Sequence, residues 1–211
     1  MKICIIGSGA MGGLYGARLI MAGEEVNFVD NRQSVVDNIN QQGVHLTGVD
    51  GEHWIPAKAS TTSSDFFPTD IAFIHTDTNN SSAAAIQANA VLAKQDGWCI
   101  TFQNGIGNVE KLQHELGIER VAGGISYHSA ASPEPGQSFH TNAGKTWIGE
   151  LDRQPSERVD ALQTTLSNAG FDVQIADDIV AIIWSKFVLN CAVNPICAIT
   201  GFRTGEIGTH T

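Results

Sequence analysis

The chain has 211 residues, of which 42% are hydrophobic and 22 are glycine, as expected for one α/β domain with room for the start of a second. Its net charge of −10 argues against nucleic acid or an anionic membrane as a general partner. No unbroken apolar run approaches about 18 residues and the first strand begins at residue 3, so we expect neither a membrane span nor a signal peptide, and a cytoplasmic protein.

The chain begins with a predicted buried strand at 3–6, a glycine-rich turn, and a helix that stops at Gly23. The turn consists of Gly7, Ser8, Gly9, Ala10, Met11 and Gly12. In this context the glycine spacing predicts dinucleotide binding. Gly7 allows the tight turn, Gly9 lets a pyrophosphate approach the backbone, and Gly12 lets the helix pack closely on the strand. These six residues are therefore the first candidate cofactor site, with the helix N-terminus facing the phosphates.

The second predicted strand, 26–29, bears on which nicotinamide cofactor is bound. It ends on Asp30, about 20 residues beyond the glycine turn, where an acidic residue commonly binds the ribose 2′-hydroxyl of NAD. Arg32 follows closely and can stack on adenine and pair with the 2′-phosphate of NADP. These residues alone leave both cofactors open.

Further along the chain, predicted strands and helices alternate. Helices are expected at 34–42, 83–93, 109–116 and 156–169, and strands at 44–47, 53–57, 70–75, 98–102, 120–125 and 171–175, with a β-rich segment at 126–150. Alternation of this kind predicts the α/β class, with a Rossmann-type doubly wound sheet that has helices on both faces. We expect this dinucleotide-binding domain to span residues 1–177.

The carboxyl ends of parallel strands form one rim, where ligands bind in such sheets. Gly7, Asp30 and the segments 75–79 and 103–105 should lie on this rim. His75 is expected to be a hydrogen-bonded structural histidine. Cys4 and Cys99 lie in predicted buried strands and should be reduced core residues, and no metal site is predicted.

From Asp178 the pattern changes to an apolar helix, predicted at 179–193, which we interpret as the start of a helical second domain over 178–211. Lys186, Asn190 and Asn194 are spaced by four residues and therefore share one helix face. A lysine and two asparagines in an apolar helix cost free energy unless they have partners. They form either a solvent-facing stripe or a site for a small anionic carbonyl compound.

With these residues included, the chain resembles the ketopantoate reductases over its whole length. The similarity includes the N-terminal KIxIxGxGAMG fingerprint, Gln103-Asn104-Gly105, Gly123-Gly124, Pro135-Gly136, Ile148-Gly149-Glu150 and the WxKFxxNxxxNP pattern at 184–195. The last pattern is the most specific, because the lysine and both asparagines match.

The resemblance implies NADP(H)-dependent reduction of a 2-keto acid in the manner of 2-dehydropantoate 2-reductase, a step of pantothenate biosynthesis, with NAD(H) as the alternative cofactor. It gives Lys186 the role of general acid, Asn190 and Asn194 that of substrate ligands, and Asn104 that of orienting cofactor and substrate. Burial beside Trp184 and Phe187 would lower the pKa of Lys186 toward the working pH. The resemblance also allows a homodimer.

Three features depart from the family pattern. Asp77 stands where members carry a lysine, which implies a different substrate or a compensating cation. Second, Asp30 precedes Arg32 where the family usually has a basic residue for the 2′-phosphate of NADP. Third, the family's chain continues for roughly another hundred residues, which supply a glutamate and a serine to the site. The alternatives are an NAD-dependent D-2-hydroxy-acid dehydrogenase, which Asp30 and Asp77 would suit, or a nucleotide-sensing module without turnover.

Overall fold

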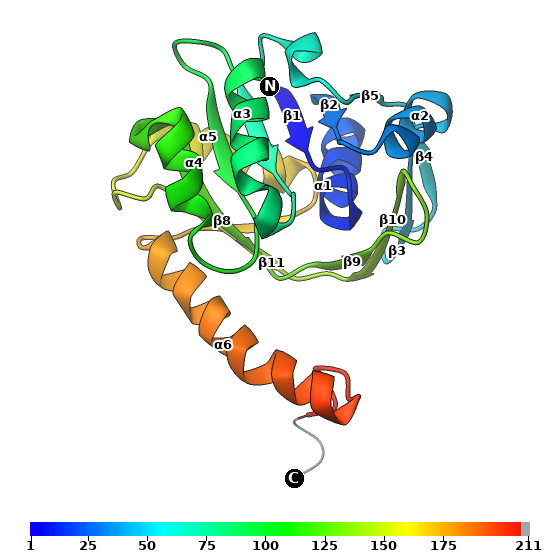
Figure 1. Ribbon diagram of the computed structural model, residues 1–211, viewed down its shortest axis with the longest axis vertical. Helices are drawn as coiled ribbons and strands as arrows, with labels where there is room; N and C mark the ends of the chain where they lie inside the picture. Colours follow the sequence, from blue (N-terminus) through cyan, green and yellow to red (C-terminus); the bar gives the residue numbers. More distant parts are fainter. Residues whose placement is uncertain (208–211) are drawn as a thin grey trace.

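The computed structural model describes residues 1–207 and is built around an eight-stranded sheet (Figure 1). In spatial order its strands are β12 (Asp172–Ile175), β11 (Lys145–Gly149), β8 (Val121–Ser126), β7 (Trp98–Thr101), β6 (Ile71–Ile74), β1 (Lys2–Ile6), β2 (Glu25–Val29) and β5 (Lys58–Ser60). From β5 to β8 all neighbouring strands are parallel, and the pairing of β8 with β11 is antiparallel. The order β5-β2-β1-β6-β7-β8 is the 3-2-1-4-5-6 order of dinucleotide-binding sheets, so the predicted fold class is confirmed.

Helices cover both faces of this sheet because alternate strand residues point to opposite sides. Ile3 and Ile5 of β1 belong to one core cluster with α1 (Ala10–Met21) and α5 (Glu157–Asn168). Cys4 and Ile6 belong to a second cluster with α3 (Ser81–Val91) and α4 (Asn108–Leu116). Cys4 and Cys99 are buried free thiols, as predicted, and desolvation raises the pKa of each to about 12.

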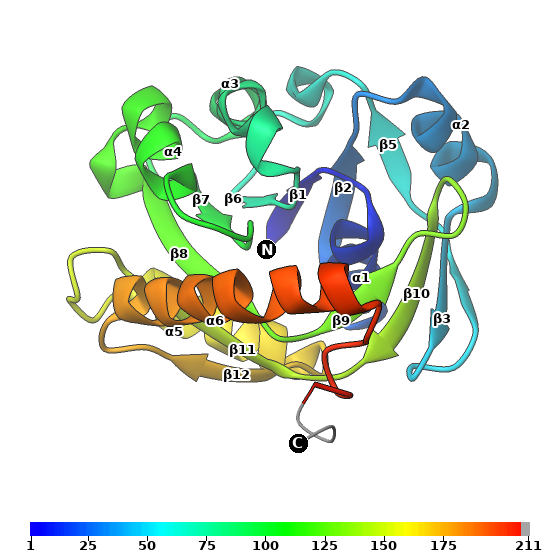
Figure 2. The same cartoon turned by 60° about the horizontal axis from the view of Figure 1, so that its bottom comes forward.

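A second, four-stranded sheet lies beside α1 and was not predicted as a separate layer (Figure 2). Its order is β4 (His53–Ile55), β3 (Val44–Gly48), β10 (Gln137–Asn142) and β9 (Ser129–Ala131), with α2 (Gln33–Gln42) preceding β3. The strands expected at 44–47 and 53–57 are present as β3 and β4 and pair in antiparallel fashion. Asp50 pairs with Arg18 of α1 and lies 2.6 Å, Oδ2 to Nδ1, from fully buried His140 of β10. The Arg18–Asp50 ion pair and the Asp50–His140 hydrogen bond join the small sheet to the dinucleotide-binding domain.

The long helix α6 (Ile179–Thr200) leaves the domain beside β8 and β11 and projects away from it (Figure 1). It continues past its predicted end at 193 and contains Pro195, although proline costs about 3 kcal/mol in a helix interior. By length and composition alone α6 could cross a membrane, with a mean hydropathy of 1.6, although Lys186, Asn190 and Asn194 interrupt its apolar residues. Apolar helices of globular proteins meet the same test, so it is weak evidence for a membrane span.

Candidate functional site

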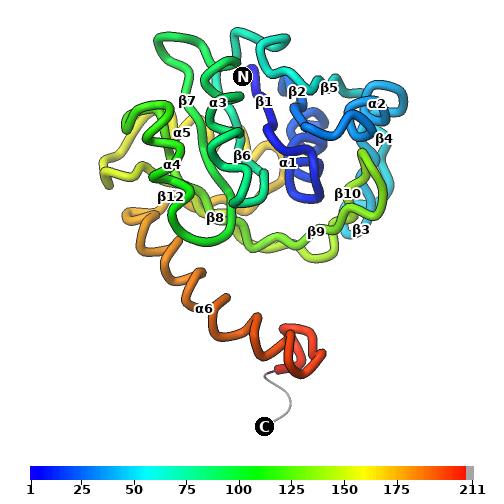
Figure 3. The backbone as a smooth tube through the Cα atoms, viewed as in Figure 1, coloured from blue at the N-terminus to red at the C-terminus, as the bar shows by residue number. Residues whose placement is uncertain are grey.

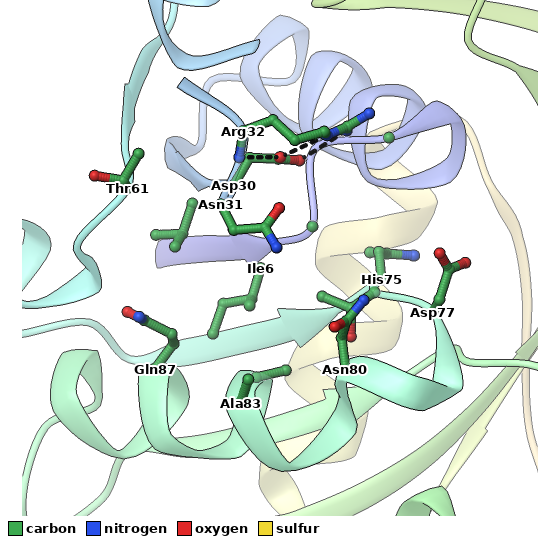
Figure 4. Close-up of a pocket in the computed structure, with 15 residues that line it drawn as sticks. Ile6, Asp30, Asn31, Arg32, Thr61, His75, Asp77, Asn80, Ala83 and Gln87 are labelled. Atoms are coloured by element: carbon green, nitrogen blue, oxygen red, sulfur yellow. Dashed lines mark hydrogen bonds and ion pairs between the residues drawn. The ribbon is translucent and has the colours of Figure 1, made fainter. Parts of the chain in front are cut away.

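A cleft of about 400 Å³ opens at the carboxyl ends of β1, β2 and β6, on the predicted rim. Figure 4 shows its lining side chains arranged around the ends of these strands. The lining residues include Gly7, Gly9, Asp30, Asn31, Arg32, Thr61, His75, Asp77, Asn80 and Gln87. The structure therefore places the glycine turn and the end of β2 around one cavity, as the sequence predicts.

The three glycines of the turn differ in what surrounds them. Gly7 has a φ of +97°, and an added Cβ would lie 2.8 Å from the backbone carbon of His75. A Cβ on Gly12 would lie 2.0 Å from the carbonyl oxygen of Gly7, which shows the close helix–strand packing expected there. A Cβ on Gly9 would meet nothing within 4 Å. The open space over Gly9 is the one through which a ligand can approach the backbone.

The residues present fit the phosphates of a dinucleotide. Gly9 caps α1 without a side chain, Ala10 and Met11 begin the helix, and its first turn contains no acidic residue. The helix N-terminus therefore offers unobstructed N–H groups and a partial positive charge. The hydroxyl of Ser8 is buried and lacks a hydrogen-bond partner among residues 1–207. A phosphate oxygen at this turn would satisfy it.

Asp30 is buried, and its carboxylate is already occupied by hydrogen bonds. Oδ2 accepts from the backbone N–H of Ser8 at 2.9 Å and from Nη2 of Arg32 at 3.0 Å. Oδ1 accepts from the backbone N–H of Arg32 at 3.1 Å and from its Nε at 2.9 Å. These bonds fill the roughly four lone-pair positions of a carboxylate, so a ribose hydroxyl can bind Asp30 only by displacing Arg32.

Arg32 keeps its side chain 56% exposed at the edge of the cleft (Figure 4). Hydrogen bonding to Asp30 raises the pKa of its guanidinium, and the charge of Asp77 adds to this effect. Asp77 itself is exposed and lines the same cleft. Within the lining of this cleft Arg32 is the one cation, between two carboxylates.

The loop after β7 carries Asn104 on a different part of the rim. Asn104 is exposed and does not line the dinucleotide cleft, whereas its neighbours Gln103 and Gly105 line a small second pocket with Trp184 of α6. This pocket brings the loop beside the first turns of α6. The loop that carries Asn104 therefore lies next to the helix that carries Lys186.

Lys186 is partly buried against the carboxyl end of β8 and the residue that follows it. Its Nζ donates to the backbone oxygen of Ser126 at 2.7 Å and lies 5.4 Å from the ring centroid of Tyr127. Desolvation lowers its pKa, in the predicted direction. The contacts of the ammonium are with Ser126 and Tyr127, however, rather than with the predicted Trp184 and Phe187, which pack edge-to-face on each other.

Asn190 and Asn194 follow Lys186 along α6, and the uninterrupted helix places all three on one face. At 1.5 Å per residue, Asn194 lies about 12 Å along the axis from Lys186. Asn190 is half-buried and Asn194 is exposed. The structure thus yields two groups on the rim, the dinucleotide cleft and the Lys186 face, with the Asn104 loop between them.

His75 packs as a structural histidine, but the hydrogen-bonded role expected for its side chain is not borne out, because its buried Nε2 has no partner among residues 1–207. Its ring stacks on Phe102 with centroids 5.3 Å apart and packs against Tyr15, while its backbone N–H donates to Ile6. Desolvation lowers the pKa of the imidazole to about 3, which keeps the ring neutral. The ring still lines the dinucleotide cleft, so it contributes a neutral aromatic wall.

Sequence reasoning missed a set of buried polar residues beneath the loops after β6 and β7. They are Ser81, Thr101 and Asn108, which join Gln103, a residue already expected on the rim. Ser81 and Asn108 are the first residues of α3 and α4, whose N-caps are Asn80 and Gly107. Small polar residues at a helix start give no sequence signal for a long-range role. Their cross-loop hydrogen bonds depend on the tertiary structure.

Two family models match the chain. The one described as "Ketopantoate reductase PanE/ApbA" matches residues 3–153, and the one described as "Ketopantoate reductase PanE/ApbA C terminal" matches 178–211. A curated 2-dehydropantoate 2-reductase of Pyrococcus horikoshii is 34% identical over 98% of this chain and 66% of its own. One of Archaeoglobus fulgidus is 28% identical over the same shares. The chain spans about two thirds of the length of these relatives.

Solved structures agree with the fold. The 2-dehydropantoate 2-reductase of Geobacter metallireducens superposes with a TM-score of 0.88 and 29% identity, over 95% of this chain and 66% of its own. A D-mandelate dehydrogenase solved with NADH and anilino(oxo)acetate superposes with a TM-score of 0.90 at 23% identity, over 100% of this chain and 68% of its own. At that identity the second likeness concerns the fold alone.

Proposed function

The chain belongs to the ketopantoate reductase family, and on that premise we propose that it reduces a small 2-keto acid to the 2-hydroxy acid with a nicotinamide cofactor. The observation that carries the proposal is the placement of Lys186. Its ammonium is partly desolvated at the carboxyl end of β8, and the first turns of its helix, α6, line a pocket with the loop after β7. A lysine with a lowered pKa in such a position suits general acid catalysis.

In the proposed reaction a bound nicotinamide supplies a hydride to the keto carbon. Lys186 polarises the carbonyl and donates a proton from Nζ to the oxygen, so the carbonyl gains one hydride and one proton and becomes an alcohol. Asn190 and Asn194 would bind the carboxylate and hydroxyl groups of the substrate from the same helix face. Asn104 would orient cofactor and substrate from the opposite loop.

For the cofactor we propose NADP(H), with NAD(H) as the alternative. Asp30 has its lone pairs filled and holds Arg32 with its guanidinium half exposed at the cleft. A 2′-phosphate could pair with Arg32 without displacing it from Asp30. A ribose hydroxyl would have to compete with a bidentate ion pair, which supports NADP(H) over NAD(H).

Two substitutions at the end of β2 should move cofactor preference in opposite directions. Arg32→Ala should lower the affinity for NADPH relative to NADH by about 10-fold or more, because a charged hydrogen bond contributes about 1.5–3 kcal/mol. Asp30→Ala should shift preference toward NADPH, because it removes a carboxylate from the vicinity of the 2′-phosphate. Fluorescence titration of both variants with both cofactors measures the ratios. An unchanged ratio would remove that residue as a cofactor determinant.

The identity of the substrate, the cellular location, the partners and the assembly are also proposals. Asp77 lines the cleft where family members carry a lysine, so the preferred substrate is expected to differ from ketopantoate unless another cation compensates. We expect a small-molecule substrate, a cytoplasmic location and no nucleic-acid partner, and a homodimer is the assembly to test by light scattering.

The decisive assay follows the loss of nicotinamide absorbance with a panel of 2-keto acids, including ketopantoate, in the full-length protein. Turnover with one of them supports the proposal, and faster turnover with NADH would favour the D-2-hydroxy-acid dehydrogenase alternative. Cofactor binding without turnover on any of them would favour a nucleotide-sensing module.

A further inference from the structure

The loops that follow β6 and β7 are tied together by buried side chains to which the proposed mechanism gives no role. Ser81 is fully buried, Asn108 is 2% exposed and Gln103 is 7% exposed. Burying polar groups costs free energy unless each one is hydrogen-bonded. Their partners therefore show which parts of the two loops they hold.

The first half of this network fixes the loop after β6. Nε2 of Gln103 lies 2.9 Å from the backbone oxygen of Thr76 and 3.0 Å from Oγ of Ser81. Oγ of Ser81 in turn lies 2.8 Å from the backbone oxygen of Thr78 and 2.9 Å from Oδ1 of Asn108. Gln103 from the loop after β7 thus binds the backbone of the loop after β6, and Ser81 contacts Asn108 across the same gap, so the two loops run next to each other in the trace (Figure 3).

The second half of the network converges on one backbone atom, the carbonyl oxygen of Asn104. Nδ2 of Asn108 donates to it at 3.0 Å, and Oγ1 of Thr78 donates to it at 3.1 Å. The side chain of Asn104 remains exposed. Two donors from two different loops therefore fix the peptide that carries this side chain.

On its other side Asn104 is followed by a glycine-rich stretch that adds little restraint. Gly105 and Gly107 have φ values of +89° and +84°, and a Cβ on either would meet nothing within 4 Å. Glycines in such conformations leave a loop with more freedom than other residues would. Because packing around these glycines is open, the hydrogen bonds to the Asn104 carbonyl restrain the peptide that links Asn104 to Gly105.

We propose that Thr78 and Asn108 are positioning residues that hold Asn104 in the orientation its amide needs to meet cofactor and substrate. This inference rests on the proposed function, in which Asn104 has that orienting role. A misplacement of about 1 Å in a reacting complex can cost about 10²-fold in rate. Loss of one of two donors should therefore cost about 10-fold in turnover.

The test is a double-mutant cycle in the full-length protein. Thr78→Val removes the hydroxyl donor with almost no change of volume and should lower kcat for the best 2-keto acid about 10-fold. In the Asn104→Ala background the same change should have almost no further effect, because Thr78 acts through Asn104. Thr164→Val is the matched control, since its Oγ1 donates only to Asp160 on distant α5, and should leave kcat unchanged.

Asn108→Ala provides an independent second cycle with Asn104→Ala, and a thermal melt shows whether the variant is folded. Additive effects of Thr78→Val and Asn104→Ala would overturn the positioning role. A wild-type protein that turns over no 2-keto acid would refute the proposed function instead. In that case the same cycle is evaluated from the dissociation constants of NADPH. Additive effects of Thr78→Val and Asn104→Ala on this constant would again count against the positioning role of Thr78, and non-additive effects would support it.

Discussion

Lys186→Ala should lower the turnover of the best 2-keto acid by about 10²–10⁴-fold, the usual contribution of a positioned acid–base group. The reason is that the variant has no group at this position to protonate the nascent alkoxide. The affinity for NADPH should barely change, because Lys186 lies on α6 and does not line the dinucleotide cleft. Steady-state kinetics of the full-length protein and a cofactor titration together measure both effects.

The pH dependence of the wild-type protein provides a second test of Lys186 as the general acid. A general acid works only in its protonated form, so the rate must fall as pH rises through the pKa of Lys186. Because desolvation lowers this pKa from 10.5, the alkaline limb should lie below that value. Lys186→Arg keeps a permanent charge, and any residual activity should lack this limb.

Near-normal turnover in Lys186→Ala would remove the lysine from the mechanism. The nucleotide-sensing alternative would then gain support, provided that NADPH still bound. Ser185→Ala is a suitable control, because Ser185 precedes the lysine on α6 and its hydroxyl donates only to the helix backbone at Ala181.

Gly9→Val should abolish measurable binding of NADPH and NADH while leaving the fold intact. Gly9 has a φ of −75° and a ψ of −159°, an extended conformation that valine also adopts, and a Cβ there meets open space. The new side chain would instead occupy the space proposed for the pyrophosphate. Fluorescence titration measures the loss of binding, and the thermal melt should stay close to that of the wild type.

Two other glycines provide controls for this result. Gly12→Ala should lower the melting temperature, because its Cβ would lie 2.0 Å from the carbonyl oxygen of Gly7. Gly205→Val also places a Cβ in open space, but outside the cleft, and should leave cofactor binding unchanged. Undiminished affinity in Gly9→Val would mean that the glycine turn has only a structural role.

The sequence by itself determined the elements whose signal is local. The apolar run at 3–6, the glycine spacing and the alternation of strands and helices follow from periodicity and turn chemistry, and the doubly wound sheet is present as predicted. The shared face of Lys186, Asn190 and Asn194 follows from helix geometry alone. The division into domains at 177 and the roles of these site residues remain predictions.

The tertiary structure decided what depends on residues far apart in the chain. The short strand β5, Lys58–Ser60, gives almost no periodic signal, and its place follows only from its pairing with β2. The parallel pairing of β3 with β10 likewise joins segments about ninety residues apart. The ammonium of Lys186 meets the carbonyl of Ser126, and Asn108 meets that of Asn104, only after the chain has folded. Local patterns specify elements, whereas the partners of buried polar groups depend on which elements the folded core brings together.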